Sequence, residues 1–240
     1  MDKAAALEAL QQGEIDLQGQ FTRGSNYTYL AQLNYQELQM DVVYKPVRGE
    51  QPLWDFPAGS LAKREVAAFV LSEALGWELV PPTVYRRKGP LGAGSCQQYI
   101  EHAAAYHYFN FTQEDRDRLR PTVLFDLITN NADRKGSHIL VSDADHHIWL
   151  IDHGLTFNVE DKLRTVVWDF AGESVPAELL EDLQRTADDL QPGGVLRQNL
   201  VAYLRSAEIH ALEGRCRDIL QSPEFPLPAE NRRVYPWPPV

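Results

Sequence analysis

Two aspartates, Asp133 and Asp152, flank a pair of short apolar runs and could together hold a cation. The runs cover residues 139–141 and 148–151, and residues 143–147 between them are rich in Asp and His. Apolar runs separated by a polar turn predict a β-hairpin. A hairpin brings the segment before its first strand beside the segment after its second, so both aspartates are expected at the same end. Adjacent carboxylates repel each other, and a divalent cation or a titrating substrate group between them relieves that repulsion.

Histidines surround this acidic pair and leave its chemistry open. His138 precedes the first run, His153 follows Asp152, and His146 and His147 lie in the turn. Imidazole and carboxylate groups are the ligands of metal-dependent hydrolases, so the cluster is compatible with that function. Asp is also common at strand ends for structural reasons alone, and that alternative stays open at this point.

A lysine on an apolar strand face is a candidate partner for a negative charge. Residues 41–46 predict a strand in which Lys45 shares a face with Val43. Such a lysine either extends its amine to solvent at a sheet edge or is held there to meet an anion.

A glutamate in the next predicted helix could pair with that lysine. Capping signals bracket residues 61–75, which predict a helix. Glu65 falls on the helix face that is expected to pack inward, where a carboxylate needs a partner. Lys45 is the natural candidate; the alternative is a glutamate at the rim that pairs with Arg64 or Lys63 and solvent.

A predicted hairpin near the N-terminus has a tip of small polar residues. Strands are predicted over residues 14–20 and 27–33, joined through Gly24, Ser25 and Asn26. Backbone N–H groups at such a tip can bind phosphate oxygens. The same residues also suit an ordinary hairpin turn.

The whole pattern predicts an α+β fold whose composition changes near residue 101. Further strands are predicted over residues 78–85 and 95–101. Helices are predicted over residues 3–12, 121–129, 177–190 and 195–220. The segment 223–240 contains six prolines and is expected to lie extended against the rest of the protein, with binding of a partner protein as the alternative.

Composition narrows the classes of function. The net charge of -11 argues against a nucleic-acid binder and a polybasic membrane anchor. The only cysteines are Cys96 and Cys216, which lie far apart in the sequence. We therefore expect no zinc-thiolate site, and we expect the protein to occur in a reducing compartment. The N-terminus has no signal-peptide core, and no apolar run is long enough to cross a membrane. We therefore expect a soluble cytoplasmic protein.

In their order along the chain, these features resemble the protein-kinase-like superfamily, most closely its phosphatidylinositol 3- and 4-kinase-like branch and compact bacterial relatives. Val43-Tyr44-Lys45-Pro46 is similar to the strand whose lysine contacts nucleotide phosphates, and Lys63-Arg64-Glu65 opens the helix with the paired glutamate. Asp133-Arg134-Lys135-Gly136-Ser137-His138 resembles the catalytic loop Asp-Arg-His-x-x-Asn. Ile151-Asp152-His153-Gly154 resembles the metal motif Ile-Asp-Phe-Gly. The resemblance covers roughly residues 20 to 170.

The resemblance implies a two-lobed fold and an ATP-dependent phosphotransferase. The N-lobe would be residues 1–101, an antiparallel sheet with one helix, and the C-lobe residues 102–240, mainly helical with a catalytic hairpin. The implied cofactors are ATP and Mg²⁺ or Mn²⁺, and the γ-phosphate would pass to a hydroxyl acceptor that the sequence does not identify. The acidic surface does not favour an anionic lipid membrane as the location of that acceptor.

The resemblance also implies roles for individual residues. Lys45 would neutralise phosphate charge while Glu65 holds it in place, Asp133 would orient and deprotonate the acceptor hydroxyl, and Asp152 and His138 would bind the metal. The remaining implied contacts are the backbone of Gly24, Ser25 and Asn26 over the phosphates, the backbone near Gln98, Tyr99 and Glu101 beside the adenine, and Lys135, Arg164 and Lys162 toward an anionic substrate.

Two departures from the family pattern bear on activity. Lys135 replaces the usual catalytic-loop histidine, and His138 replaces a metal-binding asparagine. Imidazole is a softer ligand than an amide oxygen and favours Mn²⁺ or Zn²⁺ over Mg²⁺. The alternatives are an inactive nucleotide-binding domain, a metal-dependent hydrolase with no use for Lys45 or Glu65, and an enzyme that transfers the nucleotide part of ATP.

Overall fold

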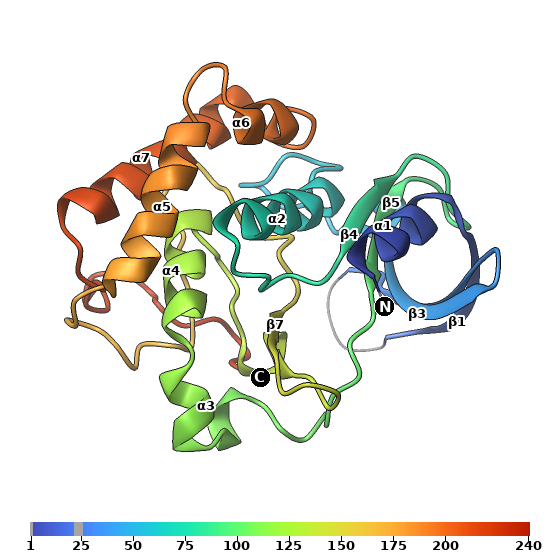
Figure 1. Cartoon of the computed structure of the whole chain (residues 1–240), viewed down its shortest axis with the longest axis horizontal. Helices are drawn as coiled ribbons and strands as arrows, with labels where there is room; N and C mark the ends of the chain where they lie inside the picture. The colour runs from blue at the N-terminus through green and yellow to red at the C-terminus, as the bar shows by residue number, and fades with distance from the viewer. Residues whose placement is uncertain (1, 22–25) are drawn as a thin grey trace.

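A five-stranded antiparallel sheet forms most of the N-terminal lobe in the computed structural model, which describes residues 2–21 and 26–240. The strand order is β1-β2-β3-β5-β4. The strands are β1 (Glu14–Gln20), β2 (Tyr29–Tyr35), β3 (Leu38–Pro46), β4 (Thr83–Arg86) and β5 (Gly94–Gln98). The sheet curls strongly (Figure 1), and helix α1 (Lys3–Gln12) lies against it.

Strand β3 has one face that packs in the core and an opposite face that carries Lys45. Met40, Val42 and Tyr44 are buried along one face, while Lys45 points to the other, as the period of two in a strand requires. The buried face packs with α1 and β2 into a small core around Leu10. The opposite face, which carries Lys45, is therefore free to face the second lobe.

Helix α2 (Leu61–Leu75) joins the two lobes. It follows β3 in the chain, but its apolar residues, such as Leu71 and Leu75, belong to the large core of the helical lobe. Arg64 in its first turns is buried and pairs with Glu208 of that lobe, while its Nη1 donates to the Thr156 carbonyl. Helix α2 thus fixes the sheet relative to the helices.

The second lobe consists of helices with a short hairpin beside them (Figure 1). The α-helices are α3 (Gln113–Asp117), α4 (Arg120–Thr129), α5 (Ala177–Asp189), α6 (Val195–Leu200) and α7 (Ser206–Gln221). The hairpin pairs β6 (Ile139–Val141) with β7 (Ile148–Leu150), with Ile139 opposite Leu150. Short 3₁₀ turns are η1 (Val47–Gly49), η2 (Tyr108–Asn110) and η3 (Gly136–His138).

This architecture confirms the predicted α+β fold with a sheet lobe and a helical lobe, and it corrects one helix. The predicted helix over 195–220 is broken between Leu200 and Ser206. The contacts of Glu208 explain the break. One of its carboxylate oxygens accepts the Arg205 backbone N–H, and the other accepts a hydrogen bond from the buried Arg64 side chain. A new helix start is required to place Glu208 there.

The strand predicted over 78–85 is also shorter than expected. Pairing begins only at Thr83, because Pro81 and Pro82 have no N–H to donate to a sheet. The Leu79 and Val80 N–H groups instead bind the Ser72 hydroxyl of α2. Similarly, β5 ends at Gln98 and not at residue 101, where the chain crosses to the second lobe.

The proline-rich segment after α7 runs along the helical lobe. Phe225 is buried there, the Val234 carbonyl accepts the Thr165 N–H, and the Pro239 carbonyl accepts the Gly136 N–H at 2.8 Å. The end of the chain consequently lies beside the turn before β6. Among the residues described, none belongs to a helix that is both long enough and apolar enough to cross a membrane.

Candidate active site

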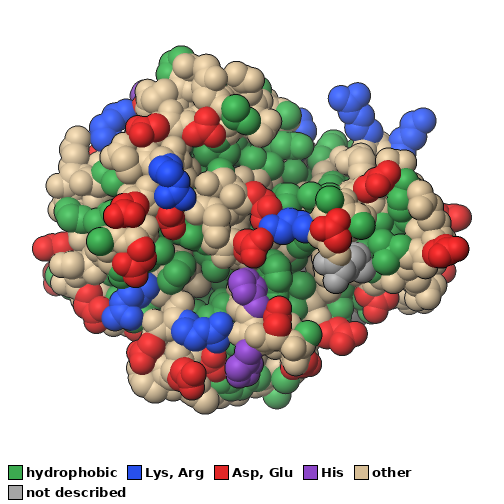
Figure 2. Space-filling view, in the orientation of Figure 1, with side chains coloured by type: hydrophobic (Ala, Val, Ile, Leu, Met, Phe, Trp, Pro, Cys, Tyr) green, Lys and Arg blue, Asp and Glu red, His purple; other side chains and the backbone are tan. Residues whose placement is uncertain are grey.

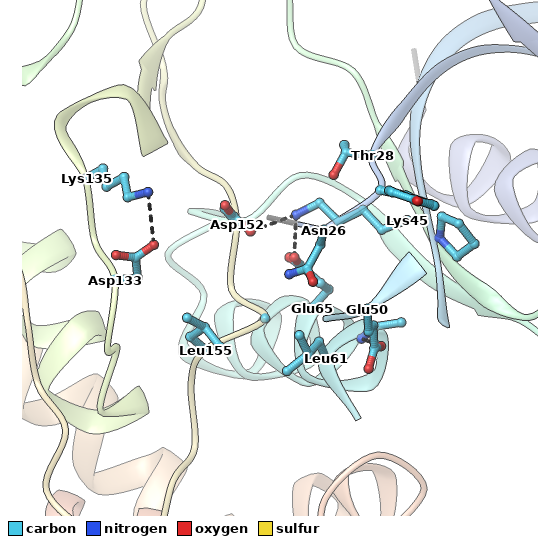
Figure 3. A pocket seen from close by; sticks show the side chains of 14 residues that line it. Asn26, Thr28, Lys45, Glu50, Leu61, Glu65, Asp133, Lys135, Asp152 and Leu155 are labelled. Atoms are coloured by element: carbon cyan, nitrogen blue, oxygen red, sulfur yellow. Dashed lines mark hydrogen bonds and ion pairs between the residues drawn. The ribbon is translucent and has the colours of Figure 1, made fainter. Parts of the chain in front are cut away.

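Lys45 lies between two carboxylates that come from different parts of the chain. Its Nζ contacts Oε1 of Glu65 on α2 and lies 3.1 Å from Oδ1 of Asp152, which follows β7 (Figure 3). The predicted partner of Glu65 is therefore found, and the alternative pairing with Arg64 is excluded, because Arg64 binds Glu208. In Figure 2, acidic, basic and histidine side chains gather in the hollow between the lobes.

The surroundings set the charge of these groups. Burial alone would lower the pKa of Lys45, but Asp152 and Glu65 outweigh it and raise that pKa, so the amine stays protonated. Burial likewise opposes ionisation of Asp152, yet nearby Lys45 and His138 hold the pKa of its carboxyl well below the usual range. Burial raises the pKa of Glu65, opposed by Lys45. The cleft therefore carries an ammonium next to an ionised, half-exposed aspartate.

His138 stands beside Asp152 as predicted for a shared metal ion. Its Nε2 lies 3.4 Å from Oδ2 of Asp152. Two atoms that each bind one metal ion at about 2.1 Å are roughly 3.0–3.4 Å apart at octahedral or tetrahedral angles, so the separation fits. Burial lowers the pKa of His138 to about 4, which keeps the ring neutral and able to coordinate. Asp152 adopts a left-handed φ of 61°, an uncommon conformation for a non-glycine residue.

These two side chains do not form a complete metal cage. No group of three or more His, Cys, Asp or Glu residues that could hold a metal ion occurs within residues 2–21 and 26–240. A cation at Asp152 and His138 would need oxygen atoms from a ligand to complete its coordination, and phosphate oxygens can provide them. The donor set therefore fits a metal that arrives with a nucleotide.

Asp133 has the properties of a general base. Burial raises its pKa to about 6, while the ammonium of Lys135, 3.2 Å from Oδ2, works in the opposite direction. The Asp133 backbone N–H donates to the Asn131 side chain, which holds the loop. A carboxylate with a pKa near neutrality can accept a proton from a hydroxyl during reaction.

Lys45, Asp133 and Asp152 line an open cleft. Its empty volume is about 730 Å³, which includes space open to solvent. Its lining residues are Asn26, Tyr27, Thr28, Lys45, Pro46, Glu50, Leu61, Ala62, Glu65, Asp133, Lys135, Asp152, Gly154 and Leu155. The cleft thus brings together Lys45, Glu65, Asp133 and Asp152, and adds Lys135, as Figure 3 shows. Glu50 was not predicted; its Oε1 accepts the Ala62 N–H and covers the start of α2.

The residues predicted to contact ATP are only partly placed in this cleft. Asn26 lines it, but its side-chain oxygen is engaged by the Gln51 N–H at 2.7 Å. Gly24 and Ser25 lie outside the described residues. The residues predicted to read the adenine, Gln98, Tyr99 and Glu101, are not among the lining residues of this cleft and lie at the crossing between the lobes.

Arg164 lies beside the loop that carries Asp133, whereas Lys162 is paired with other side chains. The backbone of Arg164 pairs with the catalytic loop through Asn131 and Arg134, and its positive charge helps to lower the pKa of Asp133. Lys162 is occupied by Glu160 at 2.9 Å and by the ring of Trp54 at 4.7 Å. In this structure Lys162 therefore pairs with acidic residues of the protein itself.

Arg134, which was not predicted as a site residue, connects several segments of the site. Its guanidinium is fully buried and pairs with Asp126 of α4, which is fully buried as well. It also donates to the carbonyls of His138 and Ile151 and to Nε2 of His153. One side chain thereby holds the loop after Asp133, the start of the hairpin and the segment around Asp152. The single acid within apolar α4, Asp126, is a signal that a buried cation lies nearby, but it does not say which cation.

No family model matches the chain. Solved structures share its fold. The Golgi casein kinase with Mn/ADP bound matches 91% of this chain and 74% of its own with a TM-score of 0.58 at 13% identity. Hydra Fam20 with sugar matches 90% and 87% with a TM-score of 0.55 at 16% identity. The Helicobacter pylori proinflammatory kinase CtkA matches 90% and 94% with a TM-score of 0.55 at 12% identity. The fold is therefore protein-kinase-like, and the narrower resemblance to the phosphatidylinositol kinase branch rests on the motifs alone.

One curated relative is much closer in sequence. Protein Rv2133c of Mycobacterium tuberculosis is 37% identical over 264 aligned positions, which cover 95% of this chain and 93% of that protein. Similarity at this level over nearly the full length of both chains goes with a common fold and a common origin. The chain belongs to the same family as Protein Rv2133c of Mycobacterium tuberculosis.

Proposed function

We propose that the protein is an ATP-dependent phosphotransferase that moves the γ-phosphate of ATP to a hydroxyl group. The observation that carries the proposal is the position of Lys45, in contact with Glu65 and Asp152 in a cleft between the lobes. In this proposal residues 1–101 form the nucleotide-binding lobe, and residues 102–240 form the catalytic lobe.

Five residues in and beside the cleft are given a chemical task in phosphoryl transfer, which depends mainly on positioning and charge neutralisation. Lys45 neutralises phosphate oxygens, and Glu65 holds its amine in place. Asp133 accepts the proton of the attacking hydroxyl. Asp152 and His138 would hold a divalent metal ion, Mg²⁺ or Mn²⁺, whose positive charge would offset that of the phosphate groups. A fold neighbour with Mn/ADP bound supports this choice of ligands.

The surroundings of Asp133 indicate the chemistry of the acceptor. Lys135 faces the cleft beside Asp133, so a cation stands next to the expected position of the attacking hydroxyl. This supports an acceptor with a negative group close to its hydroxyl. A phosphoinositide, a phosphorylated small molecule and an acidic protein segment all satisfy that condition. The resemblance to phosphatidylinositol kinases favours the first and the net charge of -11 disfavours binding to an anionic membrane.

An inactive nucleotide-binding protein is the second candidate, and Lys135 is the observation that favours it. Its ammonium lies 3.2 Å from Oδ2 of Asp133 and occupies the oxygen that would accept the proton. A hydrolase has less support, because His153 is fully buried and its ring is held by Arg134 instead of facing the cleft.

Product analysis of ATP turnover tests the proposal. Purified protein is incubated with ATP labelled in the γ-phosphate, with Mg²⁺ or Mn²⁺ and a panel of phosphorylated and plain alcohols. We expect metal-dependent formation of ADP and a labelled acceptor, both lost in Asp133→Asn. Release of pyrophosphate would indicate transfer of the nucleotide part, and ATP binding without turnover would support the inactive alternative.

A further inference from the structure

His153 is a fully buried histidine at the position next to Asp152, where the resembling motif has an aromatic residue. Its ring packs edge-on against Phe125, with centroids 5.7 Å apart and planes at 88°. An aromatic ring without polar atoms would fill the same space. The two nitrogen atoms of His153 therefore need an explanation other than packing.

Arg134 determines which nitrogen of His153 carries the proton. A guanidinium can only donate, and Nη2 of Arg134 lies 2.9 Å from Nε2 of His153. Nε2 must therefore be the acceptor, and the hydrogen of the neutral ring is on Nδ1. Burial lowers the pKa of His153 well below its ordinary value, which agrees with a neutral ring.

The Nδ1–H group is buried and has no hydrogen-bond partner among the described residues. The acceptor facing it is Oε2 of Glu65, at 4.0 Å, which is too long for a hydrogen bond. The backbone N–H of His153 already donates to this same oxygen at 2.9 Å. One donor of His153 is thus bound to Oε2 of Glu65, and the other, 4.0 Å from the same oxygen, is unused.

The unused donor becomes relevant when a ligand enters the cleft. In this structure the Lys45 amine is shared between Glu65 and Asp152. Phosphate groups would compete with Glu65 for the same amine. A buried carboxylate whose cation is partly withdrawn needs another donor, because an ionised group without partners is costly inside a protein.

We propose that His153 is a positioning residue for Glu65: its Nδ1–H becomes the second hydrogen bond to Oε2 when phosphate groups engage Lys45, and Arg134 fixes the tautomer that makes this donor available. The inference rests on the proposed function of the cleft. It links Asp126, Arg134, His153, Glu65 and Lys45 into one chain of contacts that ends at the Lys45 amine.

Two amide variants separate the two nitrogen atoms of the ring. The amide of His153→Gln reaches the place of Nε2 and can accept from Arg134, but it leaves the place of Nδ1 empty. The shorter amide of His153→Asn can donate at the place of Nδ1 and leaves Arg134 without its acceptor. The measurements are the dissociation constant of ATP in the presence of Mn²⁺ and the thermal midpoint without ligand.

The two variants should differ in opposite ways in the two measurements, the dissociation constant of ATP and the ligand-free thermal midpoint. His153→Gln should keep the ligand-free midpoint and bind ATP about tenfold more weakly, since one charge-assisted hydrogen bond is lost only in the complex. His153→Asn should lower the ligand-free midpoint more than His153→Gln does, and it should weaken ATP binding less. Wild-type ATP affinity in His153→Gln, or affinity and midpoint that fall in parallel in both variants, would overturn the inference.

A double variant tests whether the effect passes through Glu65. In a Glu65→Gln background, adding His153→Gln should not weaken ATP binding further, because the carboxylate it positions is gone. A full additional tenfold loss would contradict the proposal. If the wild-type protein does not bind ATP at all, the proposed function itself fails and the inference with it. If the wild type binds and His153→Gln binds equally well, only the inference fails.

Discussion

The Nζ atom of Lys45 lies 3.1 Å from Oδ1 of Asp152, although 107 positions separate the two residues in the chain. Lys45 comes from the sheet lobe and Asp152 from the helical lobe. In the proposed function, this cation would meet a phosphate group and this anion would meet its metal ion.

Replacement of Lys45 by Met separates a phosphotransferase from a hydrolase. We expect Lys45→Met to abolish metal-dependent ATP turnover, because the phosphate charge then has no ammonium partner. A hydrolase built on the histidines and aspartates would keep its activity. Steady-state ADP release measures the effect, and Lys63→Met, which removes a lysine of the same helix as Glu65, is the matched control with near wild-type rate.

Activity should fall as the solution becomes more acidic than about pH 6. Asp133 has to be ionised to accept a proton, and burial raises its pKa to about 6. As pH falls through this value the carboxylate is protonated and kcat/KM decreases. The pH profile of kcat/KM should therefore rise to a plateau above this range, and a flat profile down to pH 4 would contradict the role of Asp133.

Lys135 should set the position of that acid limb. Its ammonium, 3.2 Å from Asp133, lowers the pKa of this carboxyl. In Lys135→Met the lowering is lost, so the pKa of Asp133 rises and the acid limb moves to higher pH. An unchanged or lower limb would show that Lys135 does not act on Asp133 in solution.

The buried pair of Arg134 and Asp126 should dominate the stability of the catalytic loop. Both side chains are fully buried, and Arg134→Met leaves Asp126 without its cation. We expect a loss of about 3–5 kcal/mol in the free energy of unfolding, since one partner of a buried pair is removed. Urea denaturation measures it. Arg185→Met, which breaks a pair on the surface, should change stability by less than about 1 kcal/mol.

His138 should control the choice of metal. An imidazole beside Asp152 favours Mn²⁺ over Mg²⁺, and an amide oxygen is a harder ligand. We therefore expect His138→Asn to raise the ratio of activity with Mg²⁺ to activity with Mn²⁺. Titration of both metals at saturating ATP provides the ratio, and an unchanged ratio would remove His138 from the metal site.

Local patterns in the sequence were sufficient to predict how Lys45, Glu65, Asp133 and Asp152 are placed. The face of Lys45 follows from strand alternation, that of Glu65 from helical periodicity, and the approach of Asp133 to Asp152 from the hairpin between them. Each of these inferences needs only neighbouring residues and a rule of geometry. The structure brings all of them into one cleft.

Contacts between distant segments were not predictable in this way. Arg64 was considered as a partner for Glu65 but pairs with Glu208, 144 positions away, and this contact also breaks the predicted final helix. The Arg134 network was missed because nothing near Arg134 in sequence shows that Asp126 and His153 surround it. Only the packed tertiary structure determines which buried charge meets which partner.

The most direct test of the account is a thermal-shift titration with ATP and Mn²⁺ on the wild-type protein and on Asp152→Ala. The account predicts that nucleotide with metal raises the midpoint of the wild type in proportion to the logarithm of ligand concentration, and that the shift largely disappears in Asp152→Ala. A wild type whose midpoint does not respond to nucleotide, or a variant that responds as strongly as the wild type, would contradict a metal–triphosphate site between Lys45 and Asp152.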